Sequence, residues 1–485
     1  MSPPWQAVIG LEVHIRLATR TKMFCRCENR YGAAPNSLVC PICLGYPGTL
    51  PMPNRRAVEL ALRLARALDA QLAPRSVFAR KSYFYPDLPK GYQITQDEEP
   101  LARGGRLPFI KRAGAVVLRR LHLEEDAGKS VESGDEILVD FNRAGVPLVE
   151  LVTEPVLEAP DEAQDALRSL QQVVRELGVS DANLDEGGMR CDANVSVRRP
   201  GEPLGARVEV KNLNSFRFVA RALEHEIERQ ISVREAGAEV DTETRGYDEH
   251  GRTYVMRGKE DAADYRYFPE PDLPPLMLDA ALLDESYSDF PELPWDRRAR
   301  VAETLGVTAD EARLLAETPA LASYAEHAVA TYPENPQGVV NLLLNTWRRQ
   351  LDERGVGDLG NAVDRLDGVP AASTVARIVA LVDTGTLSSS AAKTVLEALW
   401  DEPDTDPVEL AQRLGVVQEN DETALLGWIE TALEENSELA DAYRRGKTQL
   451  LGFFVGEVMK RSSGRADPQA VQRLLRDRFE NPVLS

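Results

Sequence analysis

In the stretch from Leu121 to Glu154, acidic side chains follow the two-residue period of a β-strand. This feature limits the possible folds of the chain more than any other. Polar and apolar residues alternate through much of this stretch, which is the period of a β-strand with one face turned away from the core. His122 and Glu124 fall on one face of the first strand, and Glu150 lies on a later strand. Carboxylates on one sheet repel one another unless a cation lies between them, and oxygen ligands suit magnesium. The stretch therefore predicts either a site for a hard cation or a solvated strand face.

A second strand of this kind is predicted between Ala7 and Leu17. Glu12 and His14 point to the same side of it, because successive side chains of a strand alternate between its two faces. The opposite face is apolar and carries Leu11, Val13 and Ile15. A glutamate and a histidine two residues apart are a weak metal signal by themselves. Beside the later carboxylates, they favour the cation site over the solvated face.

Four of the five cysteines form two close pairs. Cys25 and Cys27 are followed, after twelve residues, by Cys40 and Cys43, which is the spacing of a structural zinc knuckle with four thiolate ligands. Disulfides are the alternative, but without a secretion signal we expect a reducing compartment. The spacing therefore predicts structural zinc. The fifth cysteine, Cys191, is predicted to be a small buried residue.

Length, net charge and the distribution of apolar residues limit the number of domains and the kinds of partner that this chain is expected to have. The chain has 485 residues, more than one hydrophobic core usually supports, so we expect two or three domains. The net charge of -21 argues against nucleic-acid binding by the whole surface, although a local basic patch remains compatible with it. We find no apolar run long enough to span a bilayer and no N-terminal secretion signal, and we therefore expect a cytoplasmic protein without membrane association.

The charge changes sign near the C-terminus. Residues 401–439 contain 12 acidic residues and 1 basic residue, whereas residues 440–485 contain 9 basic and 5 acidic residues. The final segment is therefore the one clear basic surface in the sequence, and it is predicted to bind a polyanion. Its candidate contacts are Arg444, Arg445, Lys447, Lys460, Arg461 and Arg465.

The order of elements predicts an α+β chain with a helical C-terminal half. Short strands without regular βαβ alternation favour an antiparallel sheet, with helices near residues 54–72, 161–178 and 218–233. Beyond Pro291 the sequence is rich in Ala, Leu, Arg and Glu and predicts helices joined by short breaks. We therefore expect a catalytic domain at 1–292, an all-α domain at 293–407 and a small all-α tail domain at 408–485.

Two proline-bound loops, 80–93 and 265–272, are rich in aromatic residues. In the first loop, which also contains Lys81 and Lys90, the rings are able to stack on bases or other rings while the lysines meet phosphate. The alternative is that its aromatic side chains anchor this loop in the core.

Several motifs together resemble one family, the B subunits of aspartyl/glutamyl-tRNA amidotransferase. The match runs in order along essentially the whole chain and rests on Gly10–His14, Arg80–Asp87, His122–Lys129, Arg190–Asn194, Lys211–Phe216 and Asp264–Asp272. The four-cysteine knuckle occurs in only some members of the family. The prediction of zinc therefore rests on the cysteine spacing.

The resemblance implies an ATP- and magnesium-dependent ligase that forms a carbon–nitrogen bond. The side-chain carboxylate of glutamate or aspartate, misacylated on the glutamine or asparagine tRNA, would be phosphorylated and then amidated. Ammonia would come from glutamine through a partner amidase (glutaminase), the A subunit, and a small C subunit would complete the complex. The tail domain would grip the body of the misacylated tRNA.

The resemblance also implies roles for individual residues. It assigns Glu12, His14, Glu125 and Glu150 to magnesium and Lys81 to phosphate or the substrate carboxylate. Simple strand alternation instead places Glu124 on the face of His122, and a bulge would be needed to bring Glu125 there. In and beside the motifs we expect substrate or ATP contacts from Tyr83, Tyr85, Asp87, Tyr92, Gln93, Glu124, Asn142, Arg143, Arg190, Asp192, Asn194, Glu209, Lys211, Asn214 and Arg266.

Two other functions remain compatible with these residues. One is a non-catalytic tRNA-binding scaffold whose carboxylates hold a structural ion. The other is a free-standing ATP-dependent ligase, which would need its own source of ammonia. The sequence does not distinguish a glutamyl from an aspartyl substrate.

Overall fold

The computed structural model describes residues 5–213, 215–248, 251–258, 264–354, 369–418, 421–462 and 464–480. The chain divides into two compact units, Met1–Trp295 and Asp296–Ser485. Among the described residues, no helix has the length and apolar character needed to cross a membrane.

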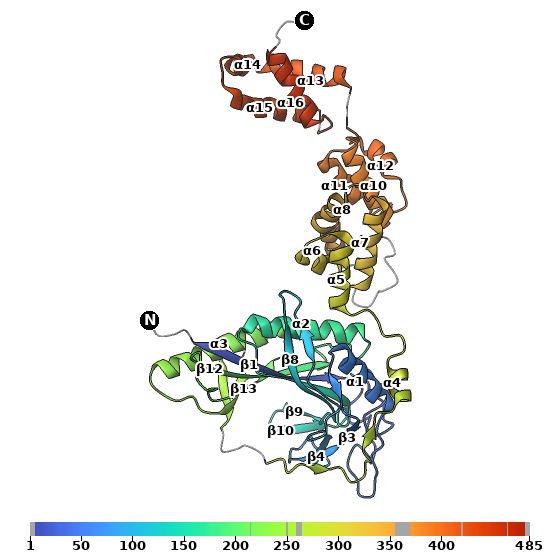
Figure 1. Ribbon diagram of the computed structural model, residues 1–485, viewed down its shortest axis with the longest axis vertical. Coiled ribbons are helices and arrows are strands. Elements are labelled where there is room, and N and C mark those ends of the chain that lie inside the picture. The colour runs from blue at the N-terminus through green and yellow to red at the C-terminus, as the bar shows by residue number, and fades with distance from the viewer. Residues whose placement is uncertain are drawn as a thin grey trace. The chain divides into compact units, whose positions relative to one another are not determined.

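The first unit is built on a ten-stranded sheet (Figure 1). In spatial order its strands are β15 (Thr253–Arg257), β14 (Glu243–Tyr247), β13 (Val208–Leu213), β12 (Met189–Arg198), β1 (Gln6–Arg16), β11 (Pro147–Thr153), β8 (Ala115–Glu125), β6 (Ala102–Arg103) and β2 (Gln71–Leu72), with β7 (Arg106–Pro108) also paired to β8. All neighbours are antiparallel except β13 and β14. A parallel pair needs a crossover, and helix α3 (Phe216–Glu235) supplies it. The α+β class is confirmed, but the sheet is mixed where we predicted an antiparallel one.

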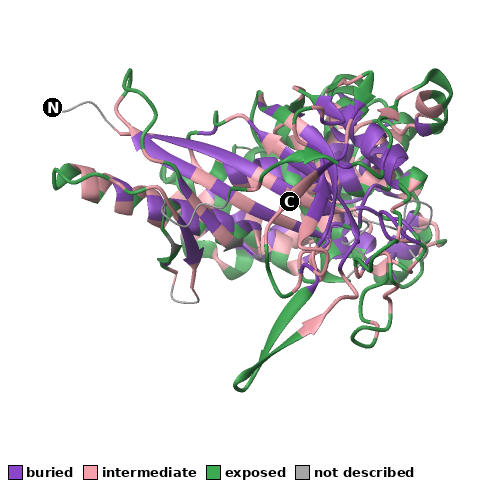
Figure 2. Ribbon diagram, turned by 90° about the horizontal axis from the view of Figure 1, so that it is seen from below, coloured by how far each residue is buried: buried purple, intermediate pink, exposed green. Residues whose placement is uncertain are grey.

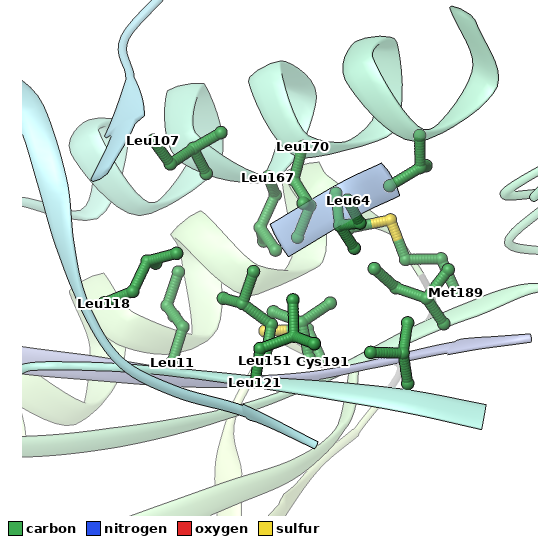
Figure 3. Packing of buried hydrophobic residues seen from close by; sticks show 14 of the residues in the cluster. Leu11, Leu64, Leu107, Leu118, Leu121, Leu151, Leu167, Leu170, Met189 and Cys191 are labelled. Carbon is green, nitrogen blue, oxygen red and sulfur yellow. The ribbon is translucent and has the colours of Figure 1, made fainter. Parts of the chain in front are cut away.

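Helices cover one face of this sheet. Helix α2 (Pro160–Glu176) and α3 lie along it, and α1 (Arg55–Ala67) packs against β8 and β11. Figure 3 shows Leu167 and Leu170 of α2 directed at Leu11, Leu121 and Leu151 of the sheet. These strand residues are the apolar half of the alternation, so their polar neighbours must point to the other face.

Smaller elements surround the opposite, polar face. Strands β4 (Ala79–Ser82), β5 (Tyr92–Thr95) and β16 (Phe268–Pro269) form a three-stranded sheet, and β3 (Arg75–Ser76) pairs with β17 (Leu276–Met277), which precedes helix α4 (Ala280–Ser286). A hairpin of β9 (Lys129–Ser133) and β10 (Glu136–Asp140) is exposed over most of its length (Figure 2).

The described part of the second unit is helical and contains two hydrophobic clusters. The first cluster joins α5 (Pro294–Leu305), α6 (Ala309–Leu315), α7 (Pro319–Thr331), α8 (Pro336–Leu342), a π-helical turn (Leu343–Trp347), α9 (Arg348–Glu353), α10 (Ala372–Asp383), α11 (Ser389–Ala398) and α12 (Pro407–Leu414). The second joins α13 (Glu422–Glu435), α14 (Ser437–Arg444), a 3-10 turn (Thr448–Leu450), α15 (Leu451–Arg461) and α16 (Pro468–Glu480). We placed α12 in the tail domain, yet its Leu410 and Ala411 pack in the first cluster.

Candidate active site and metal centres

Four polar side chains form a row across the uncovered face of the sheet. The register places His122 of β8 opposite Glu150 of β11, Glu150 opposite His14 of β1, and His14 opposite Arg190 of β12. Residues directly opposite one another in antiparallel strands carry neighbouring side chains. The alternation of four separate strands therefore brings these groups together.

A cation-binding geometry is present where Glu124 of β8 meets the two central residues of this row. His14 Nε2 lies 3.3 Å from Glu124 Oε1 and 3.4 Å from Glu150 Oε2. His14, Glu124 and Glu150, here called the cation cluster, offer three ligand atoms within 4.8 Å of one another. Ligands of an octahedral magnesium ion at about 2.1 Å lie about 3 Å apart. The cluster thus fits a hard cation after small side-chain movements.

Electrostatics support this fit, because two carboxylates are buried side by side. Burial and the charge of Glu150 raise the pKa of Glu124. Burial would also raise the pKa of Glu150, but His122 and His14 outweigh it and hold that pKa well below its usual range. Burial would lower the pKa of His14, yet the two carboxylates raise it to about 9. The cluster therefore retains positive charge in the form of a proton, and a metal ion would replace that proton.

Glu125, which the family resemblance assigned to the metal, points away from the cation cluster. The pairing of β8 with β11 continues without a register shift from Leu121 to Glu125, so the bulge that would bring it to the cluster is absent there. Its carboxylate pairs with Lys90 and accepts a 2.9 Å hydrogen bond from the backbone N–H of Ile94. Glu125, Lys90 and Cys43 line a cavity of about 230 Å³, here called the knuckle cavity.

Glu12 lies one row away from the cluster. It is opposite Asp192 of β12, and its Oε1 accepts a 2.9 Å hydrogen bond from Asn194 Nδ2. Burial and the charges of Glu150 and Glu209 raise the pKa of Glu12. Glu12 and Asn194 therefore form a neighbouring acidic position on the same face.

A second cavity, of about 370 Å³, opens beside the cation cluster and is here called the central cavity. It brings together nine of the predicted residues: His14, Lys81, Tyr83, Gln93, Glu124, Arg143, Arg190, Asp192 and Lys211. Carboxylates hold two of its cations. Arg190 Nη2 lies 2.6 Å from Asp126, and Lys211 Nζ lies 2.6 Å from Asp192 and 3.1 Å from Glu209. The cavity thus combines a cation cluster with basic groups suited to phosphate or carboxylate.

Aromatic rings extend the rim of this cavity. Tyr83 contacts both Tyr85 and Tyr265 edge to face, with ring centroids 6.0 Å apart in each pair. Lys81 Nζ lies 4.7 Å from the Tyr265 ring centroid. Tyr85 is exposed, so the loop is anchored by some rings and offers others for stacking.

The remaining predicted contacts are not gathered around the central cavity. Tyr92 lines the knuckle cavity, and Arg266 is exposed on its loop. The backbone carbonyl of Asp87 accepts a hydrogen bond from Gly128. The side chain of Asn142 accepts a 2.8 Å bond from Leu38 N and is committed to the knuckle loop. Asn214 lies outside the described residues.

Two residues of the site were not among our predicted contacts. His122 Nε2 lies 3.2 Å from Glu150 Oε2, and its buried Nδ1 lacks a hydrogen-bond partner in the described structure. Asp126 anchors Arg190. Strand alternation places His122 beside Glu124, and this signal identifies it as part of the site.

The four cysteines of the predicted knuckle converge. All are free thiols, and their sulfur atoms lie within 4.8 Å of one another, with Cys40 and Cys43 3.9 Å apart. Sulfur ligands of a tetrahedral zinc ion with 2.3 Å bonds lie about 3.8 Å apart. A hydrogen bond from Cys25 lowers the pKa of Cys43 to about 5. The arrangement fits zinc and leaves no open coordination position.

The predicted basic residues of the tail fall into two groups. Arg444, Arg445, Lys447 and Lys460 are exposed. Arg461 instead pairs with Glu435 and Glu457. The Arg465 guanidinium lies 5.6 Å from the Trp428 ring centroid. The first group is therefore open to a ligand, although Arg444 also pairs with Asp441 at 2.9 Å, whereas the second group makes its contacts within the tail.

Comparison with known proteins identifies the family of this chain. The GatB/GatE catalytic domain family matches residues 7–284, and the GatB domain family matches residues 323–479. The B subunit of the aspartyl/glutamyl-tRNA(Asn/Gln) amidotransferase of Thermus thermophilus is 48% identical over 474 residues, covering 97% of this chain and 98% of the relative. The corresponding protein of Halorhodospira halophila is 47% identical over 483 residues, covering 98% and 99%. This chain therefore belongs to the GatB family of amidotransferase B subunits.

Proposed function

We propose that this chain is the activating subunit of a tRNA-dependent amidotransferase, a glutamine-dependent carbon–nitrogen ligase. With ATP it would phosphorylate the side-chain carboxylate of glutamate or aspartate esterified to tRNA, and ammonia would then displace the phosphate. The observation that carries the proposal is the cation cluster, whose His14 and Glu124 line the central cavity together with Lys81, Arg190 and Lys211.

The residues of the cavity suit phosphoryl transfer, which depends mainly on positioning and charge. Magnesium held by the cation cluster would neutralise charge on the phosphates of ATP. Arg190 and Lys211 are fixed by Asp126 and Asp192, so they are oriented before a phosphate or carboxylate arrives. Lys81 faces the same cavity and provides a further positive charge.

We also assign structural zinc to the knuckle. Four thiolates complete the coordination of zinc, so the metal would hold the loop between Cys25 and Cys43 and would not contact substrate. Zinc analysis of the purified chain should give one equivalent, and chelation should expose four titratable thiols.

Membership of this family supports a proposal for the partners and for RNA binding. The relatives are named as subunits, which supports a complex in which an amidase, the A subunit, supplies ammonia and a small C subunit completes the assembly. Arg444, Arg445, Lys447 and Lys460 are exposed at the end of a strongly acidic chain, where they would attract tRNA phosphates.

The test is an assay of the assembled complex with misacylated tRNA, ATP and either glutamine or ammonium chloride. ADP formation should depend on the tRNA, and ammonium chloride should support amidation when the partner glutaminase is inhibited. Glu150→Gln should abolish ADP formation and amidation while glutamine hydrolysis by the partner continues. Unchanged ADP formation in this variant would favour a non-catalytic scaffold.

A further inference from the structure

Lys22 is a completely buried cation next to the cysteine knuckle. Its exposed fraction is 0%, and it is among the largest fully buried side chains in the chain. Lysine is almost never fully buried unless it is paired, because removing an ammonium group from water carries a large free-energy cost. The position of Lys22 therefore calls for a negative partner.

The surroundings of the ammonium group identify that partner. Lys22 Nζ lies 3.7 Å from Cys43 Sγ and donates a 3.3 Å hydrogen bond to the carbonyl of Phe141. No carboxylate among the described residues lies within 4.0 Å of it. The nearby Glu125 is already paired with Lys90 and bonded to Ile94 N. The contact with Cys43 is the only one that can bring negative charge to Lys22 in the described structure.

We propose that Lys22 is a positioning residue of the zinc knuckle, whose buried ammonium compensates the charge of the metal-bound thiolates. A zinc ion with four thiolates has a net charge of -2, and the Lys22 ammonium beside Cys43 offsets half of it. This inference rests on the zinc site proposed above. Cys43 Sγ also accepts a 3.2 Å hydrogen bond from Cys40 N, so the sulfur receives support from both backbone and side chain.

Lys22 also joins the knuckle to the segment that leads into β11. Its bond to Phe141 lies beside a second link, the 2.8 Å hydrogen bond from Met23 N to the carbonyl of Gly145. Within the knuckle loop, the Asn36 side chain accepts a hydrogen bond from Phe141 N. Residues 141–145 immediately precede the strand that carries Glu150. Zinc bound to the knuckle would thereby hold residues 141–145 in place, and with them the start of the strand that brings Glu150 to the cation cluster.

The experiment measures zinc release to a chromophoric chelator from the zinc-loaded full-length chain. Removal of a group in contact with metal ligands typically weakens binding by about 10–100-fold. Lys22→Met and Lys22→Gln, which remove the charge, should therefore release zinc about 10–100-fold faster than wild type. Lys22→Arg should release it at nearly the wild-type rate. Lys90→Met is the matched control, because it removes a lysine that lines the knuckle cavity beside Cys43 but is paired with a carboxylate instead of a thiolate.

The outcomes separate the inference from the zinc proposal. Wild-type protein without zinc would end the zinc assignment itself. Zinc-loaded wild type and a folded neutral variant with equal release rates would overturn the role of Lys22 while leaving the zinc site intact. Equal acceleration in Lys22→Gln and Lys90→Met would also overturn it, by showing that loss of either lysine near the knuckle has the same effect. If both neutral variants fail to fold while Lys22→Arg folds and retains zinc, the need for a positive charge is supported.

Discussion

At the scale of single residues, two adjacent glutamates of β8 illustrate how strand geometry assigns a role. Glu124 belongs to the cation cluster, whereas Glu125 pairs with Lys90 in the knuckle cavity. Successive side chains point to opposite faces of a strand, and β8 has no register shift at this point that would change this. Resemblance to a family identified the motif, but only the backbone register decides which glutamate joins the cation cluster.

The first prediction compares Glu124→Gln with Glu125→Gln. Glu124→Gln replaces a carboxylate ligand by a neutral amide and should weaken magnesium binding at least tenfold, about 1.4 kcal/mol. Glu125→Gln should leave magnesium affinity unchanged and should lower the free energy of unfolding, because it removes the buried partner of Lys90. Calorimetric titration of magnesium into each variant, with urea unfolding in parallel, measures both effects. The opposite order of magnesium affinities would place Glu125 at the metal.

At the scale of elements, periodicity predicted most of the first unit. The helices expected near residues 54–72, 161–178 and 218–233 are present as α1, α2 and α3. Alternation also predicted which strand faces are polar, and so the side of each strand on which His14 and Glu150 lie. Alternation also placed Glu124, and not Glu125, on the face of His122, as the structure has it. The parallel pairing of β13 with β14 was not predictable in this way, because it depends on which strands become neighbours and local spacing carries no information about that.

A buried network fixes α3 to the edge of the sheet. Glu226 of α3 is fully buried, and its carboxylate accepts hydrogen bonds from Arg229 at 2.6 Å, Gln230 at 2.9 Å and Thr253 of β15 at 2.9 Å. Arg245 of β14 lies 3.3 Å away. One carboxylate thus joins the crossover helix to both strands that follow it.

The second prediction concerns Glu226→Gln. Loss of one partner from a buried ionic network costs roughly 3–5 kcal/mol, so the free energy of opening of α3 should fall by about that amount. Hydrogen exchange followed by mass spectrometry measures it directly on α3 peptides. Glu224→Gln, at an exposed position of the same helix, is the control and should change little.

The same network has a definite pH dependence. Burial would raise the pKa of Glu226, but the hydrogen bonds from Arg229 and Gln230 outweigh it and lower the pKa below the ordinary value of 4.5. A lowered pKa means that the stabilisation is fully present above 4.5 and is lost as the pH falls through the lower value of the folded state. The difference between wild type and Glu226→Gln should therefore be constant from pH 7 to 5 and shrink below 4.5. A difference that grows on acidification would contradict this network.

At the scale of the whole molecule, the chain carries a net charge of -21 and yet belongs to a family whose named members act on tRNA. An acidic surface repels a polyanion, so binding must concentrate where basic residues are exposed.

The third prediction compares two neighbouring residues of α15. Lys460→Ala should lower the slope of log affinity against log salt by about 1, because a phosphate contact releases about one counterion. Arg461→Ala should leave that slope unchanged and should destabilise the tail, since Arg461 pairs with Glu435 and Glu457. Filter binding at several salt concentrations measures both slopes, and equal slopes for Lys460→Ala and wild type would exclude this contact.

The last prediction uses two glycines on the exposed surface of α15. Gly452 and Gly456 lie one helical turn apart, and a Cβ added at either would meet nothing within 4 Å. Alanine is favoured over glycine inside a helix by roughly 0.5–1 kcal/mol, so Gly452→Ala and Gly456→Ala together should stabilise the tail. If the glycines let a phosphate backbone approach the helix beside Lys460, the same two methyl groups should lower tRNA affinity about tenfold, about 1.4 kcal/mol.

Gly427→Ala in α13 is the matched control, because its added Cβ is also free of contacts but lies in the acidic part of the tail. That control should raise stability without changing tRNA affinity. A double variant that is more stable and binds tRNA as tightly as wild type would mean that the RNA does not contact this face of α15.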